Sequence, residues 1–113
     1  MHIDDYSFGR IVINSTVYTS DVIIYPDRVD ASWWRKEGHN LQESDLKDIL
    51  TAKPETLIIG TGYSGVMQVP EKTRRLLESK NITVHIERTG TAVDIFNRLS
   101  KKKAVIAAFH LTC

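Results

Sequence analysis

The sequence predicts an α/β protein in which an N-terminal antiparallel meander joins a mostly parallel mixed sheet. Two observations lead to this prediction. Residues 8–35 are rich in β-branched residues and interrupted by turn residues, a pattern typical of short strands. From residue 56 onward, short apolar runs alternate with segments whose apolar residues recur every three or four positions, which indicates strands that alternate with helices.

In the N-terminal part we expect three short strands, at about 9–13, 17–25 and 29–35. The pairs Asn14-Ser15 and Pro26-Asp27 separate them as turn residues, and turns this short join antiparallel neighbours. Residues 36–42 are too polar for a buried strand and contain a glycine, so we expect a loop there.

We expect three helices, near 44–52, 70–79 and 91–101. Ser44 is the predicted N-cap of the first, Pro70 the first residue of the second, and Thr91-x-x-Asp94 a capping-box-like start of the third. The side chains expected to face the core are Leu46, Ile49, Leu50, Thr73, Leu76, Leu77, Ala92, Ile95, Phe96 and Leu99. The strands between and after these helices are expected at 56–60, 82–86 and 104–109.

Composition favours one domain of 113 residues with an ordinary core, since 42% of the residues are hydrophobic and 26% are charged. A formal net charge of +1 gives no reason to expect nucleic acid or an anionic membrane as the main partner. No apolar run approaches the length of a membrane span, and the first residues carry acids, so we expect a cytoplasmic protein. The single cysteine, Cys113, excludes an intramolecular disulfide and a CxxC motif.

The stretch GTGYSG, residues 60–65, has the G-x-G-x-x-G spacing of a dinucleotide-binding loop and follows an apolar run. However, residues 66–69 separate the glycines from the next helix, so a phosphate would face a loop, and too few strands follow for that fold. We therefore expect no cofactor. Two interpretations stay open. Gly60 and Gly62 allow the chain to leave the sheet, or the amides around Thr61, Gly62 and Tyr63 form a nest for a small anionic ligand.

The chain ends with His110-x-x-Cys113, a spacing found in zinc sites and in activated thiolates. If residues 109–113 are extended, side chains three apart point to opposite faces, which argues against the pair. A metal ion would need a further ligand from His39 or His85, and nothing in the sequence shows that these side chains converge. We therefore predict no metal site. The alternative to a binding function is a small enzyme that uses Cys113 with His110 or His39.

Trp33, Trp34 and Arg35 are interface candidates, because tryptophan and arginine are enriched in protein interfaces. In a strand, one indole would face the core and the other the solvent. The alternative is that a crossing helix covers both.

Several short motifs occur in an order that resembles one family. They are Phe8-Gly9, Tyr18-x-x-Asp21, Trp34-Arg35-x-x-Gly38-His39, Ile59-Gly60-Thr61-Gly62, Thr89-x-x-Ala92, Asn97-x-Leu99 and Ala107-Ala108-Phe109-His110-x-x-Cys113. The chain resembles a small single-domain family of unknown function that includes the mitochondrial complex I assembly factor 3 and the adipogenesis-associated domain-containing protein. Its ending is most similar to the archaeal and adipogenesis-associated branch.

The resemblance implies a three-layer domain, no established catalytic activity, and action through protein contact in assembly or signalling. We therefore expect a non-enzymatic, assembly factor-like binding domain with an unidentified protein partner; a small anionic ligand and a homo-oligomer are further options. Its working surface is expected to combine the 60–65 loop, the 36–40 loop and the chain end. The ligand-binding candidates are Gly60, Thr61, Gly62, Tyr63 and His39.

Overall fold

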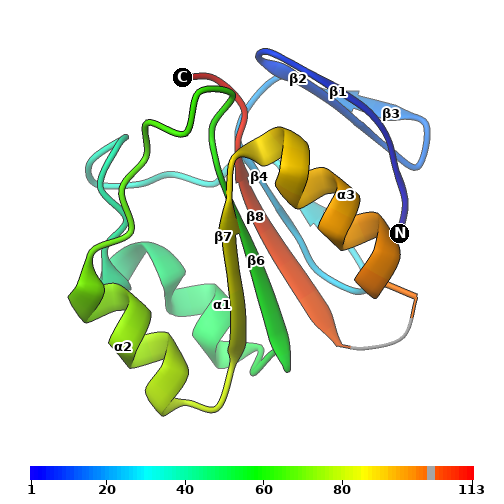
Figure 1. The fold of residues 1–113 in the computed structure, drawn as a ribbon. Helices are drawn as coiled ribbons and strands as arrows, with labels where there is room; N and C mark the ends of the chain where they lie inside the picture. Colours follow the sequence, from blue (N-terminus) through cyan, green and yellow to red (C-terminus); the bar gives the residue numbers. More distant parts are fainter. Residues whose placement is uncertain (102–103) are drawn as a thin grey trace.

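A computed structural model describes residues 1–101 and 104–113, and its strands form two sheets (Figure 1). The small antiparallel sheet contains β1 (Ile3–Ser7), β2 (Arg10–Ile13) and β3 (Thr16–Tyr18). The five-stranded sheet contains β4 (Val22–Ile24), β5 (Val29–Asp30), β6 (Thr56–Thr61), β7 (Thr83–Glu87) and β8 (Val105–His110), in the order β5-β4-β8-β6-β7. Strands β6, β7 and β8 are parallel, and β4 is antiparallel to both of its neighbours. The predicted fold class is confirmed.

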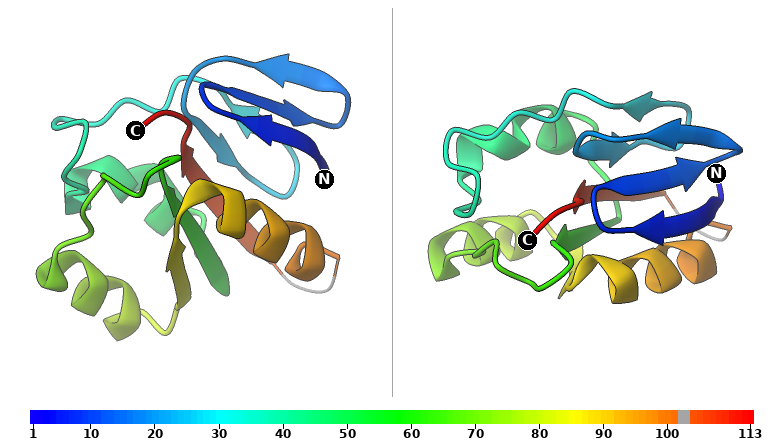
Figure 2. Two further views of the ribbon diagram at one scale, coloured as in Figure 1. Left: turned by 45° about the horizontal axis from the view of Figure 1, so that its top comes forward. Right: turned by 90° about the horizontal axis from the view of Figure 1, so that it is seen from above.

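The large sheet is the middle layer of three (Figure 2). A short 3-10 helix (Glu43–Leu46), α1 (Lys47–Thr51) and α2 (Glu71–Ser79) cover one face, and α3 (Thr89–Leu99) covers the other together with the small sheet. Alternate residues of the central strands enter the two cores, as pleating requires. Leu57, Ile59, Ile106 and Ala108 face α1 and α2, whereas Ile58, Ala107 and Phe109 face α3.

The N-terminal strands differ from the prediction. The expected strand 17–25 is broken between β3 and β4, because the side chain of Asp21 turns inward to accept hydrogen bonds. The expected strand 29–35 stops at Asp30, since the following residues leave the sheet and bury Trp33. Strand β1 was not predicted, because only Ile3 of its residues is fully buried.

The predicted helices are present, but their first turns differ. Ser44 is not the N-cap: the carboxylate of Asp45 instead accepts the amides of Gln42 at 2.9 Å and Lys36 at 3.0 Å. Pro70 precedes α2 as its cap residue. Thr91 does not open α3, which begins two residues earlier at Thr89, where a buried hydroxyl makes tertiary hydrogen bonds.

Within the described residues no helix has the length and hydropathy needed to cross a membrane. Strands β7 and β8 each lie one residue further along than predicted. The shift in β8 matters for function, because it makes His110 the last residue of a central strand.

Candidate functional site

The three parallel strands β6, β7 and β8 have their carboxyl ends at the same end of the large sheet. His110 ends β8 and lies opposite Thr61, the last residue of β6. Open α/β sheets bind ligands at the carboxyl ends of their strands. The alternation along β8 directs the His110 side chain toward the face that carries α1 and α2, where the 33–41 segment crosses.

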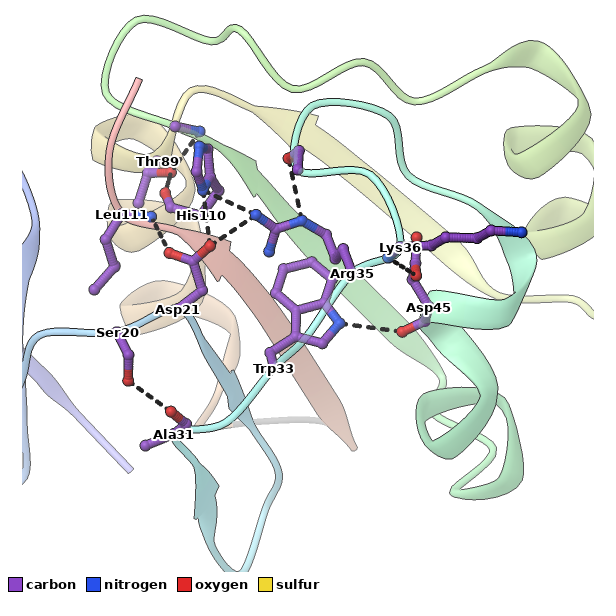
Figure 3. Close-up of polar contacts among 12 residues, drawn as sticks. Ser20, Asp21, Ala31, Trp33, Arg35, Lys36, Asp45, Thr89, His110 and Leu111 are labelled. Atoms are coloured by element: carbon purple, nitrogen blue, oxygen red, sulfur yellow. Dashed lines mark hydrogen bonds and ion pairs between the residues drawn. The ribbon is translucent and has the colours of Figure 1, made fainter.

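A largely buried charge cluster surrounds His110 (Figure 3). Asp21 Oδ2 lies 2.8 Å from His110 Nδ1 and 2.8 Å from Arg35 Nη2, and Asp21 Oδ1 accepts the Leu111 amide at 2.8 Å. Arg35 also stacks its guanidinium on the Trp33 ring, 4.5 Å from the ring centroid. The cluster therefore joins the break between β3 and β4, the 33–41 segment and the end of β8.

The carboxylate of Asp21 is the charged centre of this cluster. Burial by itself raises its pKa, but hydrogen bonds from His110, the Leu111 amide and Arg35 outweigh burial and lower the pKa from 3.8 to about 2. Asp21 is therefore ionised at neutral pH, and an ionised carboxylate can only accept hydrogen bonds.

This ionisation decides that His110 Nδ1 must carry a proton. Because Asp21 Oδ2 can only accept, the contact at 2.8 Å requires a proton on His110 Nδ1. Arg35 Nη2 lies 3.1 Å from the same Nδ1, but two donors cannot bond each other, so this guanidinium nitrogen pairs with Asp21. In neutral His110 the other nitrogen, Nε2, then carries a lone pair. Nε2 is buried and has no hydrogen-bond partner among the described residues.

His39 and Cys113 meet His110 at this place. One nitrogen of each histidine and the cysteine Sγ all lie within 4.8 Å of one another. The rings of His39 and His110 are edge to face with centroids 5.6 Å apart. The expectation that His110 and Cys113 point to opposite faces is wrong, because β8 ends at His110 and Cys113 has a φ of +34°. His85, on β7, is not part of this group.

The first half of the glycine loop, residues 60–62, is buried and packs against the chain end. Gly62 has a φ of +110°, and an added Cβ would lie 2.6 Å from the Cys113 carbonyl carbon and 2.9 Å from His110 Cδ2. Glycine is therefore required for this close approach. The Gly62 amide donates to Thr89 Oγ1 at 2.9 Å, and the Tyr63 amide donates to the Thr112 carbonyl at 3.2 Å. An anion bound in the predicted nest would have to displace these two bonds.

Two other ligand-binding candidates from the loop, Gly60 and Thr61, are buried within the fold. Gly60 is buried, with Thr89 Oγ1 2.7 Å from the position a Cβ would occupy. Thr61 is also buried, and its hydroxyl donates to the Glu87 carbonyl at 3.1 Å. Tyr63 and His39 are the candidates whose side chains reach solvent.

The three interface candidates differ in their exposure to solvent. Trp33 is 8% exposed and donates its Nε1 proton to the Asp45 carbonyl at 3.1 Å, while the guanidinium of Arg35 is buried in the charge cluster. Trp34 is 76% exposed, so it alone of the three offers a free surface.

Asp21 and Thr89 are the site residues that reasoning from sequence overlooked. Thr89 Oγ1 donates to the His110 carbonyl at 2.6 Å while it accepts the Gly62 amide, so it fastens the glycine loop to β8. A signal for Asp21 existed, because an acid directly before the apolar run Val22-Ile23-Ile24 is expected to need a partner.

Known proteins share this architecture over most or all of their length. The family described as "Protein of unknown function (DUF498/DUF598)" matches residues 3–110. A conserved hypothetical protein from Pyrococcus horikoshii is 26% identical over 100% of both chains, with a TM-score of 0.86. An outer membrane protein from Bartonella henselae is 28% identical over 98% of this chain and 94% of its own, with a TM-score of 0.81.

A Bordetella pertussis protein described as a Mth938-like domain is 22% identical over 97% of this chain and 85% of its own, with a TM-score of 0.73. At that identity the likeness concerns the fold alone.

Proposed function

The chain belongs to the DUF498/DUF598 family, and we propose that it is a binding domain that contacts a partner protein at one end of the molecule. That end combines the 60–65 loop, the 36–40 loop and the chain end. Backbone hydrogen bonds hold these segments together. The Tyr63 amide of the loop donates to the Thr112 carbonyl at 3.2 Å, and the Gln68 amide, just after the loop, donates to the His39 carbonyl at 2.8 Å. The fold itself therefore links the segments of this surface to one another.

A group of aromatic side chains at this end supports the proposal most directly. Tyr6, Phe8 and Tyr63, which we call the aromatic patch, come from β1, the β1–β2 turn and the glycine loop. Phe8 and Tyr63 are 58% and 57% exposed, and their rings are edge to face with centroids 5.8 Å apart. The centroids of Tyr6 and Tyr63 are 6.4 Å apart. Exposed aromatic residues that gather in one place are typical of protein interfaces.

The test compares partner capture by three forms of the protein. The immobilised chain is incubated with an extract of its own cells, and a captured protein is then purified and its affinity measured. Phe8→Ser with Tyr63→Ser should weaken binding at least about tenfold, because exposed aromatic anchors carry much of an interface's energy. Val17→Ser, which removes an exposed apolar side chain from β3, is the matched control and should bind like the wild type. Equal affinity for all three forms would refute the proposal.

The same variants test self-association. If the partner is a second copy of the chain, sedimentation of the wild type and of Val17→Ser should depend on concentration. The variant with both aromatic residues replaced should then sediment as a monomer.

We further propose that this chain stands with the archaeal and adipogenesis-associated branch of the family and is assembly factor-like. The ending His110-x-Thr112-Cys113 supports the branch, and the aromatic patch supports action through protein contact.

The meeting of His110 and Cys113 favours a second candidate function, a small enzyme with a cysteine nucleophile. The lone pair of His110 Nε2 could accept the thiol proton, while Asp21 holds the ring in the required tautomer. Alkylation of Cys113 by iodoacetamide at pH 7 should then be much faster in the wild type than in His39→Asn and His110→Gln. Equal rates in all three would exclude this candidate.

A further inference from the structure

Three side chains with metal-binding chemistry converge where the 36–40 loop meets the chain end. They are His39 from the loop, His110 from the end of β8, and Cys113 from the residues that follow it. We propose that these three side chains bind a zinc-like divalent transition metal ion. The three ligands lie outside the aromatic patch, so loss of metal binding and loss of partner binding can be tested separately.

His110 is the anchor of this site. It is 6% exposed, its Nδ1 is held by Asp21 at 2.8 Å, and its Nε2 is buried with no hydrogen-bond partner among the described residues. Buried polar atoms nearly always have a partner. A carboxylate that holds one nitrogen of a histidine while the other binds the metal is a recurring arrangement in zinc proteins, because it fixes the tautomer and the ring orientation.

The charges around the ring permit a cation. Asp21 and Arg35 form an ion pair at 2.8 Å, so the charged group behind the imidazole is neutral as a whole. The guanidinium approaches Nδ1, the nitrogen on the side of the ring away from the lone pair of Nε2. Cys113 would supply a negative charge when it binds as a thiolate, with its proton released to solvent.

The distances among the three ligand atoms fit a zinc ion after a small movement of the two exposed side chains. Zinc bonds of about 2.0–2.3 Å in a tetrahedral arrangement place the ligand atoms about 3.3–3.8 Å apart. The three groups lie within 4.8 Å of one another. His39 and Cys113 are exposed and can close the difference of about 1 Å by side-chain rotation, whereas His110 is already fixed.

The ligand types select the class of ion. Two imidazoles and one thiolate suit zinc and its neighbours in the first transition row, and they do not suit calcium or magnesium, which prefer oxygen. Three protein ligands leave one tetrahedral position open for water or for a group from another molecule. The bound ion would also join the 36–40 loop to the chain end.

The experiment titrates the reduced, metal-free protein with Co²⁺ and with Zn²⁺. Cobalt is followed by its thiolate-to-metal charge-transfer absorption, and zinc by calorimetry. We expect one ion per chain and a charge-transfer band that disappears in Cys113→Ser. Loss of a residue that only hydrogen-bonds a metal ligand lowers metal affinity roughly 10- to 100-fold. His39→Asn removes a ligand itself, so its metal affinity should fall by more than that. His85→Asn, a histidine outside the group, is the matched control and should bind like the wild type.

Each contrary result is decisive. Binding that survives Cys113→Ser unchanged, or that His85→Asn weakens as much as His39→Asn does, would place the ion elsewhere. Bound cobalt without a thiolate band, or no binding at millimolar metal, would also overturn the proposal. Because His39 and Cys113 are exposed, we expect their variants to fold like the wild type, and circular dichroism of each variant checks this.

Discussion

Replacing Asp21 by Asn should make the protein less stable at neutral pH, by an amount that shrinks in acid. The folded pKa of about 2 lies below 3.8, and each pKa unit corresponds to about 1.4 kcal/mol, so ionised Asp21 contributes about 2 kcal/mol to the free energy of unfolding. Because the folded pKa is the lower one, the stabilisation is complete well above pH 3.8 and is lost as the pH falls toward 2. About 1 kcal/mol should have disappeared at pH 3.

The assay is urea unfolding of the wild type and Asp21→Asn at several pH values between 7 and 3. Other acids titrate in both proteins, so the difference between the two unfolding free energies isolates Asp21. Asp94→Asn, at an exposed acid on α3, is the control for loss of one negative charge and should stay within about 0.5 kcal/mol of the wild type at neutral pH. A difference for Asp21→Asn that is the same at pH 7 and pH 3 would refute the reasoning.

Three further predictions concern the parts that hold the site in place, all measured by urea unfolding. Gly62→Ala should cost about 1–3 kcal/mol or more, because the residue has a positive φ and touches the chain end, whereas Gly90→Ala, with nothing within 4 Å of the added Cβ, should be neutral or stabilising. Thr89→Val should cost about 1–3 kcal/mol, since it leaves the buried Gly62 amide without an acceptor, and a loss near zero would contradict that bond. Trp33→Ala should cost about 3–5 kcal/mol and Trp34→Ala less than about 0.5 kcal/mol; equal losses would contradict their placement.

The alternating helices and strands after residue 56 could be predicted because their local patterns agree with the fold. Every expected helix and strand in that region is present, with ends that differ by one or two residues. The N-terminal part was predicted less well. Its strand breaks depend on Asp21 and Trp33, whose hydrogen-bond partners, Leu111 and Asp45, lie outside the N-terminal strands, 90 and 12 residues away.

The candidate site could be predicted only as a set of loops. Placement at the carboxyl strand ends follows from topology, and His39, His110 and Cys113 were named from their chemistry. Their meeting depends on how the chain turns after His110, and no local pattern reports that turn. Likewise, the glycine spacing suggested a ligand loop, whereas the backbone of Gly62 instead makes room for the chain end.

The state of the His110 ring is the central claim, because both the metal site and the thiol chemistry require an unprotonated Nε2. The two neighbours of Nδ1 make opposite demands: Asp21 requires a proton there, and Arg35 would require a lone pair. Long-range ¹H–¹⁵N correlation spectroscopy of the ¹⁵N-labelled, metal-free protein at pH 8 separates the two. A proton on Nδ1 and none on Nε2 is the predicted result, and a proton on Nε2 with Nδ1 unprotonated would contradict it.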